Sequence, residues 1–482
     1  MKVLFAIVLF FTIPQAFAQE FPEYGVSVET VADNLSVPWS IDFAEDGRIF
    51  FTERTGNVRV IQDEELLPPI LTLDVAGGEG GLLGIKLDPD FEQNNYVYLY
   101  YTYNEFFETK NKVVRYVEND NSLREDTILL ESFAGASYHD GGRMDFGPDG
   151  KLYITTGDAG MPEMSQDQNT VVGKILRINP DGTIPDDNPY ANAVYSLGHR
   201  NPQGIAWDRD GRMFATEHGP SGWRGFAHDE INQIISGKNY GWPEIIGDET
   251  KDGMTNPVLH SGDDTWAPSG ASFYYGGQIP QWTGNLFVAT LRGEHLHMIS
   301  FEQDMVKSHE KLFFEDFGRL RDVVEGPDGY LYLLTSNRDG RGSPASNDDR
   351  ILRIMPMTVI SSFEQCVEAG NPVMESYPRQ CRTHDGKHFV EAISKIPSWI
   401  KDIAKWWSLG QITDQDFALG LEFLIMKNVI VVPEDTTLEE SPESNIPSWL
   451  RENAGGWSQG ILSDEEFLQS IQWMIDNQFI RT

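Results

Sequence analysis

The feature that most constrains the fold is a turn rich in Asp and Gly, which recurs along the first 356 residues and leads each time into a β-type run. Asp-Gly pairs supply the positive φ that tight hairpin turns require, and alternating aromatic and β-branched residues suit strands with one buried face. Each instance therefore predicts a β-hairpin. The six instances span residues 45–51, 88–99, 148–154, 208–214, 282–288 and 327–333.

The intervals between these turns are long and irregular, and each has room for four short strands and a variable loop. Radial repetition of such units leaves only short, protected sheet edges. We therefore predict an all-β fold, a six-bladed β-propeller over residues 22–357. A β-sandwich of independent hairpins would explain the turns but not the six long intervals.

The N-terminus has the order of a secretory signal: Lys2, an apolar run, and the small residues Ala16 and Ala18. A membrane anchor is the alternative, but the run is shorter than the roughly 20 residues that a spanning helix needs. No later segment qualifies as a transmembrane segment. We expect a signal peptide over residues 1–18 and a secreted protein, extracellular or associated with the cell surface.

After Pro356 the pattern changes to a short segment that contains the two cysteines of the chain, Cys366 and Cys381. In an exported chain they predict one disulfide and a small stapled module over residues 360–392. In the chain-entropy model, a disulfide that closes a loop of that size stabilises the folded state by roughly 3 kcal/mol. A metal site would need more thiolates.

The last part of the chain is a sequence repeat, 396–430 and 446–480, joined by an acidic, Pro-containing linker over residues 431–445. In each copy a helix is expected to begin near Thr413 or Ser463, and the apolar residues that follow recur with helical spacing. We predict two helical hairpins, each packed on its own tryptophan-bearing first helix. A glycan or other cell-surface partner for exposed tryptophans is the alternative to a core role. The tryptophans interpreted as core are Trp399, Trp406, Trp407, Trp449 and Trp457.

The chain has 37 basic and 74 acidic residues, a net charge of −37. This charge repels phosphate backbones, so nucleic acid is excluded as a partner. Clustered arginines in such an acidic chain therefore indicate an anion site.

Three loop segments concentrate polar chemistry: 138–143, 199–204 and 216–220. Their imidazole, guanidinium, amide and backbone carbonyl groups suit an oxidised, anionic cofactor held with a hard cation. His199 itself is assigned a structural role. No nucleotide-binding Gly fingerprint, Ser-His-Asp order or paired thiolates occur, which argues against nicotinamide, hydrolase and zinc chemistry.

In its motifs and their order, the chain resembles the soluble quinoprotein glucose dehydrogenase family, and more closely its aldose sugar dehydrogenase branch. The resemblance covers most of residues 25 to 356. The motifs that carry it are GEGGLLG (78–84), DPDF (88–91), HDGGR (139–143), FGPDG (146–150), GKILRI (173–178), GHRNPQG (198–204), DEIN (229–232), NYGWP (239–243), APSG (267–270) and RLRD (319–322).

The resemblance implies oxidation of an aldose at its anomeric carbon to the lactone, with pyrroloquinoline quinone (PQQ) taking the hydride and an external acceptor taking the electrons. It makes His139 the catalytic base and places Arg200 and Asn201 over the quinone carbonyl. Arginine binds carboxylates with a planar fork, so Arg292, Arg319 and Arg321 are assigned to the cofactor. His218 joins this cofactor-binding set.

The resemblance also implies Ca²⁺, with backbone carbonyls of Gly219 and Pro220 as ligands. Asp229 and Glu230 either help to bind a second calcium or cap the neighbouring turn.

The chain departs from the glucose dehydrogenase pattern at His218 and Glu79, where Gln is usual, and at Tyr138, which precedes the base in place of Asp. The sugar preference is therefore open. Glu79 and Asp140 are assigned to the substrate, and Asp140 is the expected residue to orient His139. The alternatives to a dehydrogenase are a non-catalytic propeller that binds a ligand or partner at the same loops, and a lactonase, against which the arginines argue.

Overall fold

The computed structural model describes residues 18–220, 226–303, 305–357, 361–374, 379–383, 386–391, 396, 399–427, 429–430 and 446–480. It divides into two compact units, Met1–Thr358 and Val359–Thr482, which we describe separately. Most of the predicted signal peptide and the predicted acidic linker lie outside the described residues.

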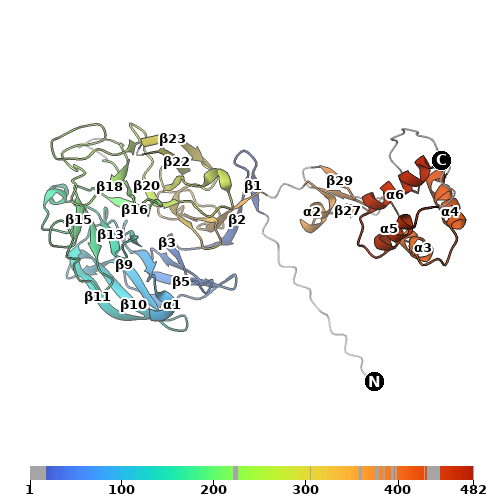
Figure 1. Ribbon diagram of the computed structural model, residues 1–482. Helices are drawn as coiled ribbons and strands as arrows, with labels where there is room; N and C mark the ends of the chain where they lie inside the picture. Colours follow the sequence, from blue (N-terminus) through green and yellow to red (C-terminus); the bar gives the residue numbers. More distant parts are fainter. Residues whose placement is uncertain are drawn as a thin grey trace, which may run out of the picture. The chain divides into compact units, whose positions relative to one another are not determined.

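The first unit is built from six antiparallel sheets, as the all-β prediction requires (Figure 1). Each sheet takes consecutive strands of the chain, except that β1 and β2 join the last sheet. The first two sheets are β3 (Pro38–Phe43), β4 (Ile49–Glu53), β5 (Asn57–Gln62) and β6 (Glu65–Leu66) with β7 (Leu71–Thr72), and then β8 (Leu82–Leu87), β9 (Tyr96–Glu105), β10 (Glu108–Glu118) and β11 (Leu123–Ala134). The next two are β12 (Met144–Phe146), β13 (Leu152–Thr156), β14 (Lys174–Ile178) and β15 (Val194–Leu197), and then β16 (Pro202–Trp207), β17 (Met213–Glu217), β18 (Glu230–Ile234) and β19 (Leu259–His260). The last two are β20 (Pro268–Phe273), β21 (Leu286–Thr290), β22 (Leu296–Glu302) and β23 (Met305–Leu312), and then β24 (Leu320–Glu325), β25 (Leu331–Thr335), β26 (Ile351–Pro356), β2 (Val26–Ala32) and β1 (Gln19–Phe21).

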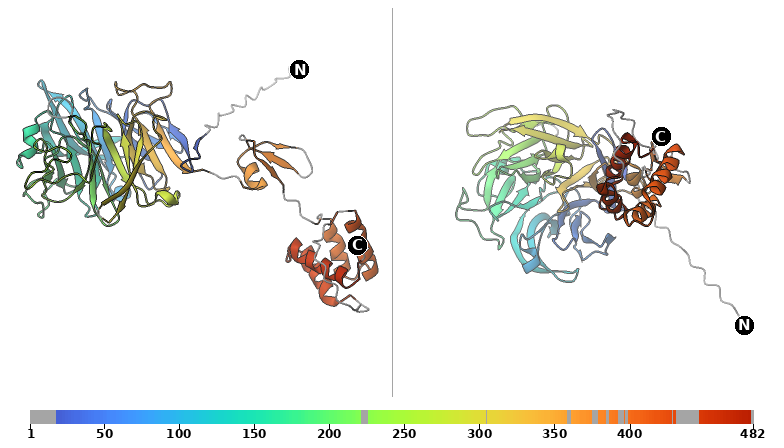
Figure 2. Two further views of the ribbon diagram at one scale, coloured as in Figure 1. Left: turned by 90° about the horizontal axis from the view of Figure 1, so that it is seen from above. Right: turned by 45° about the vertical axis from the view of Figure 1, so that its right-hand side comes forward.

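The first strands of the six sheets form a closed ring (Figures 1 and 2). β3 contacts β8, β8 contacts β12, and the series continues through β16, β20 and β24 back to β3. The ring is fastened where β2 pairs with β26, so that strands from both ends of the unit complete one sheet. Helix α1 (Phe91–Asn94) and the 3-10 helices η1 (Pro162–Gln166) and η2 (Pro280–Trp282) lie in the connections.

All six predicted turns connect the first strand of a sheet to the second, which confirms the hairpin predictions. Gly150, in the turn from β12 to β13, has a φ of 68°, the conformation for which glycine is suited. Because the strands are antiparallel, the connections from second to third strands leave from the opposite end of each sheet. We call this opposite end the loop end.

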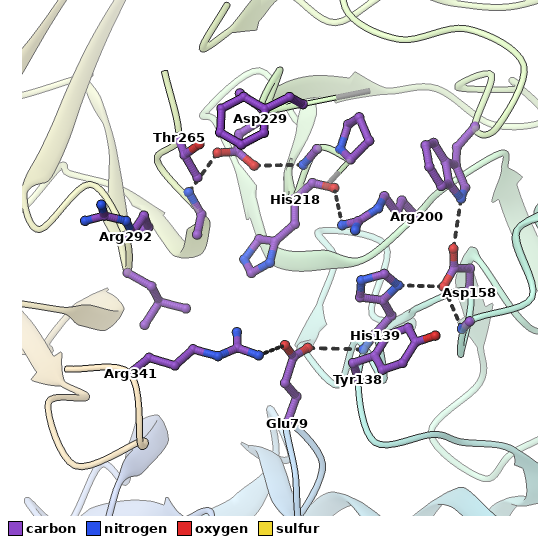
Figure 3. Close-up of a pocket in the computed structure, with 18 of the residues that line it drawn as sticks. Glu79, Tyr138, His139, Asp158, Arg200, His218, Asp229, Thr265, Arg292 and Arg341 are labelled. Atoms are coloured by element: carbon purple, nitrogen blue, oxygen red, sulfur yellow. Dashed lines mark hydrogen bonds and ion pairs between the residues drawn. The ribbon is translucent and has the colours of Figure 1, made fainter. Parts of the chain in front are cut away.

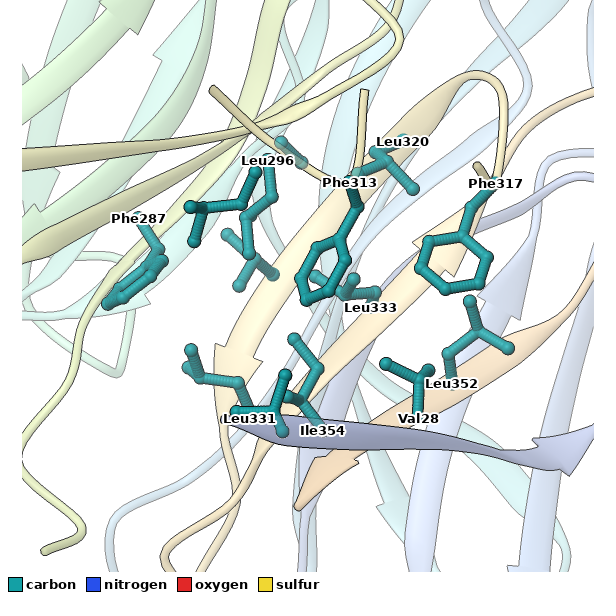
Figure 4. Close-up of a cluster of buried hydrophobic side chains, with 14 of the residues drawn as sticks. Val28, Phe287, Leu296, Phe313, Phe317, Leu320, Leu331, Leu333, Leu352 and Ile354 are labelled. Carbon is teal, nitrogen blue, oxygen red and sulfur yellow. The ribbon is translucent and has the colours of Figure 1, made fainter. Parts of the chain in front are cut away.

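Apolar side chains fill the space between neighbouring sheets (Figure 4). Between the last two sheets, Phe287 and Leu296 pack against Leu320, Leu333 and other buried residues, and Val28 of β2 joins the same cluster. Each such side chain contributes about 1.5–3 kcal/mol when it is fully buried. This packing makes the loop end a rigid support.

The second unit begins with a small module that contains α2 (Phe363–Glu368) and the sheet β27 (Val373–Met374), β28 (Gln380–Arg382) and β29 (His388–Val390). Cys366 and Cys381 form the predicted disulfide, with their Cα atoms 6.0 Å apart. Among the described residues of this module, the buried apolar cluster consists of Phe363 and the two half-cystines, with Phe389 partly buried beside them. A core this small explains why a crosslink is useful.

The described residues that follow contain the helices α3 (Ile400–Ser408), α4 (Asp414–Met426), α5 (Ser448–Ser458) and α6 (Asp464–Asp476). Thr413 and Ser463 begin α4 and α6 with capping boxes. Trp407 stacks on Phe417 and Trp457 on Phe467, each pair with 4.0 Å between ring centroids. In each copy the second helix therefore packs on the tryptophan-bearing first helix of the same copy, as predicted.

The two copies also share one hydrophobic core, and α3 contacts α5 directly. The interpretation of all five tryptophans as core is wrong for three of them: Trp399, Trp406 and Trp449 are 51%, 48% and 40% exposed. Helical spacing alone did not show which face the partner helix would cover. Among the described helices, none has the length and apolar content needed to cross a membrane.

Candidate active site

A cavity of about 1040 Å³ opens at the loop end (Figure 3). Its walls come from connections of several sheets, so residues far apart in the sequence face one another. The lining includes Glu79, Tyr138, His139, Asp158, Arg200, His218, Gly219, Pro220, Asp229, Trp242, Arg292, Arg319 and Arg341.

His139 projects into this cavity and is held by Asp158, not by Asp140 as expected. The His139 Nδ1 atom lies 2.7 Å from Asp158 Oδ1, and the Asp158 side chain is 1% exposed. A carboxylate only accepts hydrogen bonds, so Nδ1 carries the proton, and in the neutral ring the lone pair is therefore on Nε2. His139 therefore has the tautomer that a general base requires.

Local backbone geometry fixes this arrangement. His139 has a φ of 60°, in the left-handed region that costs energy for a residue with a side chain and is common at functional sites. Gly157 lies so close that a Cβ there would come within 1.9 Å of the His139 carbonyl oxygen. Only glycine fits at this point between the base and its partner.

Asp158 stays ionised because several donors surround it. Burial alone would raise its pKa, but hydrogen bonds from His139, the Gly160 amide and the Trp242 indole leave the pKa lowered. The Trp242 indole nitrogen lies 2.9 Å from Asp158 Oδ2. The Arg200 guanidinium also lies over the Trp242 ring, with 5.4 Å between its Cζ atom and the ring centroid.

Arg200 is a buried cation at the cavity wall. Its Nη1 donates to the His218 carbonyl at 3.2 Å, and burial lowers its pKa. Its neighbour Asn201 lies deeper, where Asn201 Oδ1 accepts the Gly141 amide at 3.1 Å. His199 is fully buried between Glu217 and Ser196, which agrees with its structural assignment.

A second cavity, of about 240 Å³, shares Glu79, His218, Leu291, Arg319 and Arg341 with the first. Arg319 and Arg321 both line it, as the alternation of the RLRD motif predicts. Burial, together with repulsion from Arg54 and Arg319, lowers the pKa of Arg321 to about 9. The region is thus an unusually positive one in an acidic protein.

The three predicted cofactor arginines differ in how far they are already paired. Arg319 binds the buried Asp339 carboxylate at 2.7 Å. Arg321 donates to Gln203 Oε1 at 2.9 Å, but among the residues that the structure describes its Nε has no partner. Arg292 lines the cavity wall from the connection between β21 and β22.

Unpaired buried donors support a bound anionic group at this position. Within the described residues, the buried atoms without a hydrogen-bond partner include Asn201 Nδ2, His218 Nε2 and Arg321 Nε. Such groups are costly unless a ligand satisfies them. Burial also lowers the pKa of His218 to about 3, so its ring is neutral. The donor set fits a planar, oxygen-rich anion such as PQQ.

Of the four predicted metal ligands, Gly219, Pro220 and Asp229 line the first cavity. Asp229 Oδ1 accepts the Gly219 amide at 2.7 Å, and its Oδ2 accepts the Trp266 and Ala267 amides at 2.7 and 2.8 Å. Asp229 therefore clamps two loops, which is the capping alternative.

Glu230 lines neither of these two cavities. Burial, and to a smaller extent repulsion from Glu217, raises the pKa of Glu230 to about 8. In the part of the chain that the structure describes, no group of three or more His, Cys, Asp or Glu side chains could hold a metal ion.

The two predicted substrate residues also differ. Glu79 crosses the cavity rim: its Oε1 lies 2.7 Å from Arg341, and its Oε2 accepts the His139 amide at 3.2 Å (Figure 3). Asp140 is 3% exposed, and its Oδ1 accepts the Ala136 amide and the Asn111 side chain. Burial raises the pKa of Asp140 to about 7. Asp140 lines the second cavity and not the first, and within the described residues its Oδ2 has no hydrogen-bond partner.

The sequence interpretation missed Asp158, Trp242, Arg54 and Arg341. Asp158 follows the β13 run after one glycine, at the same strand end as His218 after β17, and this parallel could have identified it. Arg54 follows β4 directly and has the same signal, whereas Arg341 lies in the middle of the long connection from β25 to β26 and has none. Arg341 meets Glu79 because the ring of sheets closes.

A carboxylate-held base beside a positive cavity defines an enzyme site that takes an anionic cofactor. The family model described as Glucose / Sorbosone dehydrogenase matches residues 35–353, so the chain belongs to this family and is an oxidoreductase.

Two curated relatives and a solved structure are similar to this chain. It is 34% identical to aldose sugar dehydrogenase of Escherichia coli over 65% of this chain and 91% of the relative. It is 29% identical to quinoprotein glucose dehydrogenase B of Acinetobacter calcoaceticus over 70% of this chain and 90% of the relative. PQQ-bound aldose sugar dehydrogenase of Streptomyces coelicolor superposes with a TM-score of 0.62 at 35% identity, over 68% of this chain and 98% of that chain.

Proposed function

We propose that this protein is an exported, PQQ- and calcium-dependent dehydrogenase that oxidises an aldose at its anomeric carbon to the lactone. The observation that carries the proposal is His139 with its Nδ1 held by Asp158 at the wall of a cavity whose other end is lined by arginines. PQQ, when bound, supplies the hydride acceptor, and Ca²⁺ holds it in place.

The protein groups would act as follows. His139 Nε2 removes the proton of the anomeric hydroxyl, and the ionised Asp158 stabilises the imidazolium that forms. Arg200, close to the cavity wall and poorly solvated, stabilises negative charge that develops beside it. Glu79 and Arg341, at the rim, would contact the sugar hydroxyls.

The cofactor would be held by Arg292, Arg319 and Arg321 through its carboxylates, with the unpaired donors of Asn201 and His218 directed at its oxygens. Carbonyl groups of Gly219 and Pro220 would bind the calcium ion, which prefers oxygen ligands. Asp229 would serve by fixing the Gly219 loop.

We assign the six sheets as blades of a propeller over residues 22–357, followed by the stapled module (360–392), the first helical repeat (396–430), the linker (431–445) and the second repeat (446–480). The signal peptide, residues 1–18, would direct export to the cell exterior or surface. The electrons would leave to an external acceptor.

The test is reconstitution. The purified chain is mixed with PQQ and Ca²⁺, and reduction of an artificial dye is followed with several aldoses. We expect aldose-dependent reduction with lactone as the product, loss of turnover in His139→Ala with PQQ binding retained, and full turnover in the control His388→Ala, a residue exposed in the second unit. No dye reduction with any aldose, together with no PQQ binding, would contradict the proposal.

A further inference from the structure

The six connections from second to third strands are equivalent positions at the loop end, and five of them supply a cavity residue. These five residues are Arg54, Asp158, His218, Arg292 and Arg341. The sixth connection, between β9 and β10, lines neither cavity. It carries Phe106 and Phe107 instead.

The Phe106–Phe107 tip is unfavourable for an isolated protein. The two side chains are 89% and 110% exposed, and their φ angles are 45° and 75°. A left-handed residue with a side chain costs roughly 1–2 kcal/mol, which is why Asn-Gly is the usual pair at such a turn. Two exposed aromatics in a strained turn indicate a contact that another molecule would complete.

The tip reaches beyond the inner strand of its sheet. Leu82, the first residue of β8, pairs with Tyr101, whereas β9 and β10 stay paired up to Glu105 and Glu108. Four further residues per strand correspond to roughly 13 Å. The hairpin therefore projects at the same end as the cavity that contains His139.

We propose that the Phe106–Phe107 tip is the docking contact for the protein that accepts electrons from this enzyme, a basic redox protein with an apolar depression around its redox centre. The inference rests on the proposed function. The tip would insert as an aromatic anchor, and the net charge of −37 would attract a lysine-rimmed partner. Glu105 and Glu108 flank the tip and share one cation, Lys110.

The tip suits this partner better than a sugar polymer. Two adjacent protruding phenyl rings form a knob that needs a receiving depression, not a flat platform for a sugar ring. The oxidation also requires an electron acceptor, and this acceptor must approach the cavity, which opens at the same end of the sheets as the tip. Each aldose oxidised to lactone releases two electrons and two protons, so two one-electron acceptors must be reduced in turn.

The test replaces the tip by the pair that its backbone prefers, Phe106→Asn with Phe107→Gly. This change removes both aromatics while relieving the turn, so the variant is expected to unfold at the same or a higher temperature. The matched control is Met305→Ser, which alters a 70% exposed apolar residue at the turn from β22 to β23, away from the loop end. The probe is a basic c-type cytochrome at low ionic strength.

Binding of the oxidised cytochrome to the chain without PQQ is measured first, and then its reduction by the PQQ- and Ca²⁺-loaded enzyme with aldose. We expect the tip variant to weaken binding and slow cytochrome reduction about tenfold or more, with dye reduction unchanged. The control should behave as the parent chain. Equal cytochrome binding by the parent and the tip variant would overturn the proposal, as would a tip variant that instead loses self-association of the chain. Failure of the proposed function is distinct, because it would abolish dye reduction in the parent.

Discussion

Replacing Asp158 by Asn tests whether the base is set by its buried partner. In the native site all three contacts of the carboxylate are donors: His139 Nδ1 at 2.7 Å, the Gly160 amide at 2.9 Å and the Trp242 indole at 2.9 Å. An amide must turn its NH₂ group toward at least one of them. If the NH₂ group faces the Trp242 indole N–H, the donor–donor contact displaces the side chain and with it the imidazole; if it faces His139, the imidazole loses the tautomer that leaves Nε2 free.

The size of the effect follows from these contacts. A hydrogen bond to a charged group contributes about 1.5–3 kcal/mol, which corresponds to about 10–150-fold in rate. Loss of the reactive tautomer extends the expected decrease in kcat to roughly 10⁴-fold.

The assay is steady-state dye reduction with saturating PQQ, Ca²⁺ and aldose, and PQQ binding is titrated separately. Asp149→Asn is the control, since Asp149 binds Arg177 and Tyr153 in the same sheet but lines neither cavity. A kcat for Asp158→Asn close to that of the control would refute the assignment of His139 and Asp158 as a base and its orienting residue.

Three further outcomes are expected. Arg321→Ala should raise the Kd for PQQ about 10–150-fold, measured by calorimetric titration; an unchanged Kd would remove Arg321 from the cofactor site. Because burial raises the pKa of Asp140 from 3.8 to about 7, the folded chain binds a proton that the unfolded chain releases between these values. The contribution of Asp140 to the free energy of unfolding should therefore fall by about 4 kcal/mol as pH rises from about 4 to 7, and the difference between the parent and Asp140→Asn in denaturant titrations should change by that amount; equal slopes would contradict this account. Cys366→Ser should destabilise the small module by roughly 3 kcal/mol, seen as faster proteolysis within it, whereas dye reduction should be unaffected; unchanged proteolysis would show that the crosslink adds little.

Much of the fold could be predicted because its signals are local. The six turns between first and second strands are encoded by Asp and Gly within a few residues, and all six lie where predicted. The same holds for the capping boxes at Thr413 and Ser463. The shared core of the two helical repeats was not predicted, since an apolar stripe does not identify the helix that will cover it.

The site was predictable only in part, because the partners of several site residues come from other parts of the chain. His139, Arg200, His218, Arg292 and Arg319 line one cavity, as the motifs indicated. Their partners come from distant segments: Asp339 binds Arg319, and Arg341 meets Glu79 across 262 positions of sequence. The first contact forms within the last sheet, but the second depends on closure of the ring, which no short segment encodes.

Glycines at the two ends of the sheets are required for different physical reasons. At the turn end, Gly150 has a φ of 68° and open space around it, so its requirement is conformational and a side chain there would cost backbone energy alone. At the loop end, a Cβ on Gly157 would meet both the His139 carbonyl and Asn201 Oδ1, so its requirement is space beside the base. The two ends of the sheets thus carry different constraints: one is set by turn chemistry within a few residues, and the other by groups that converge from separate sheets.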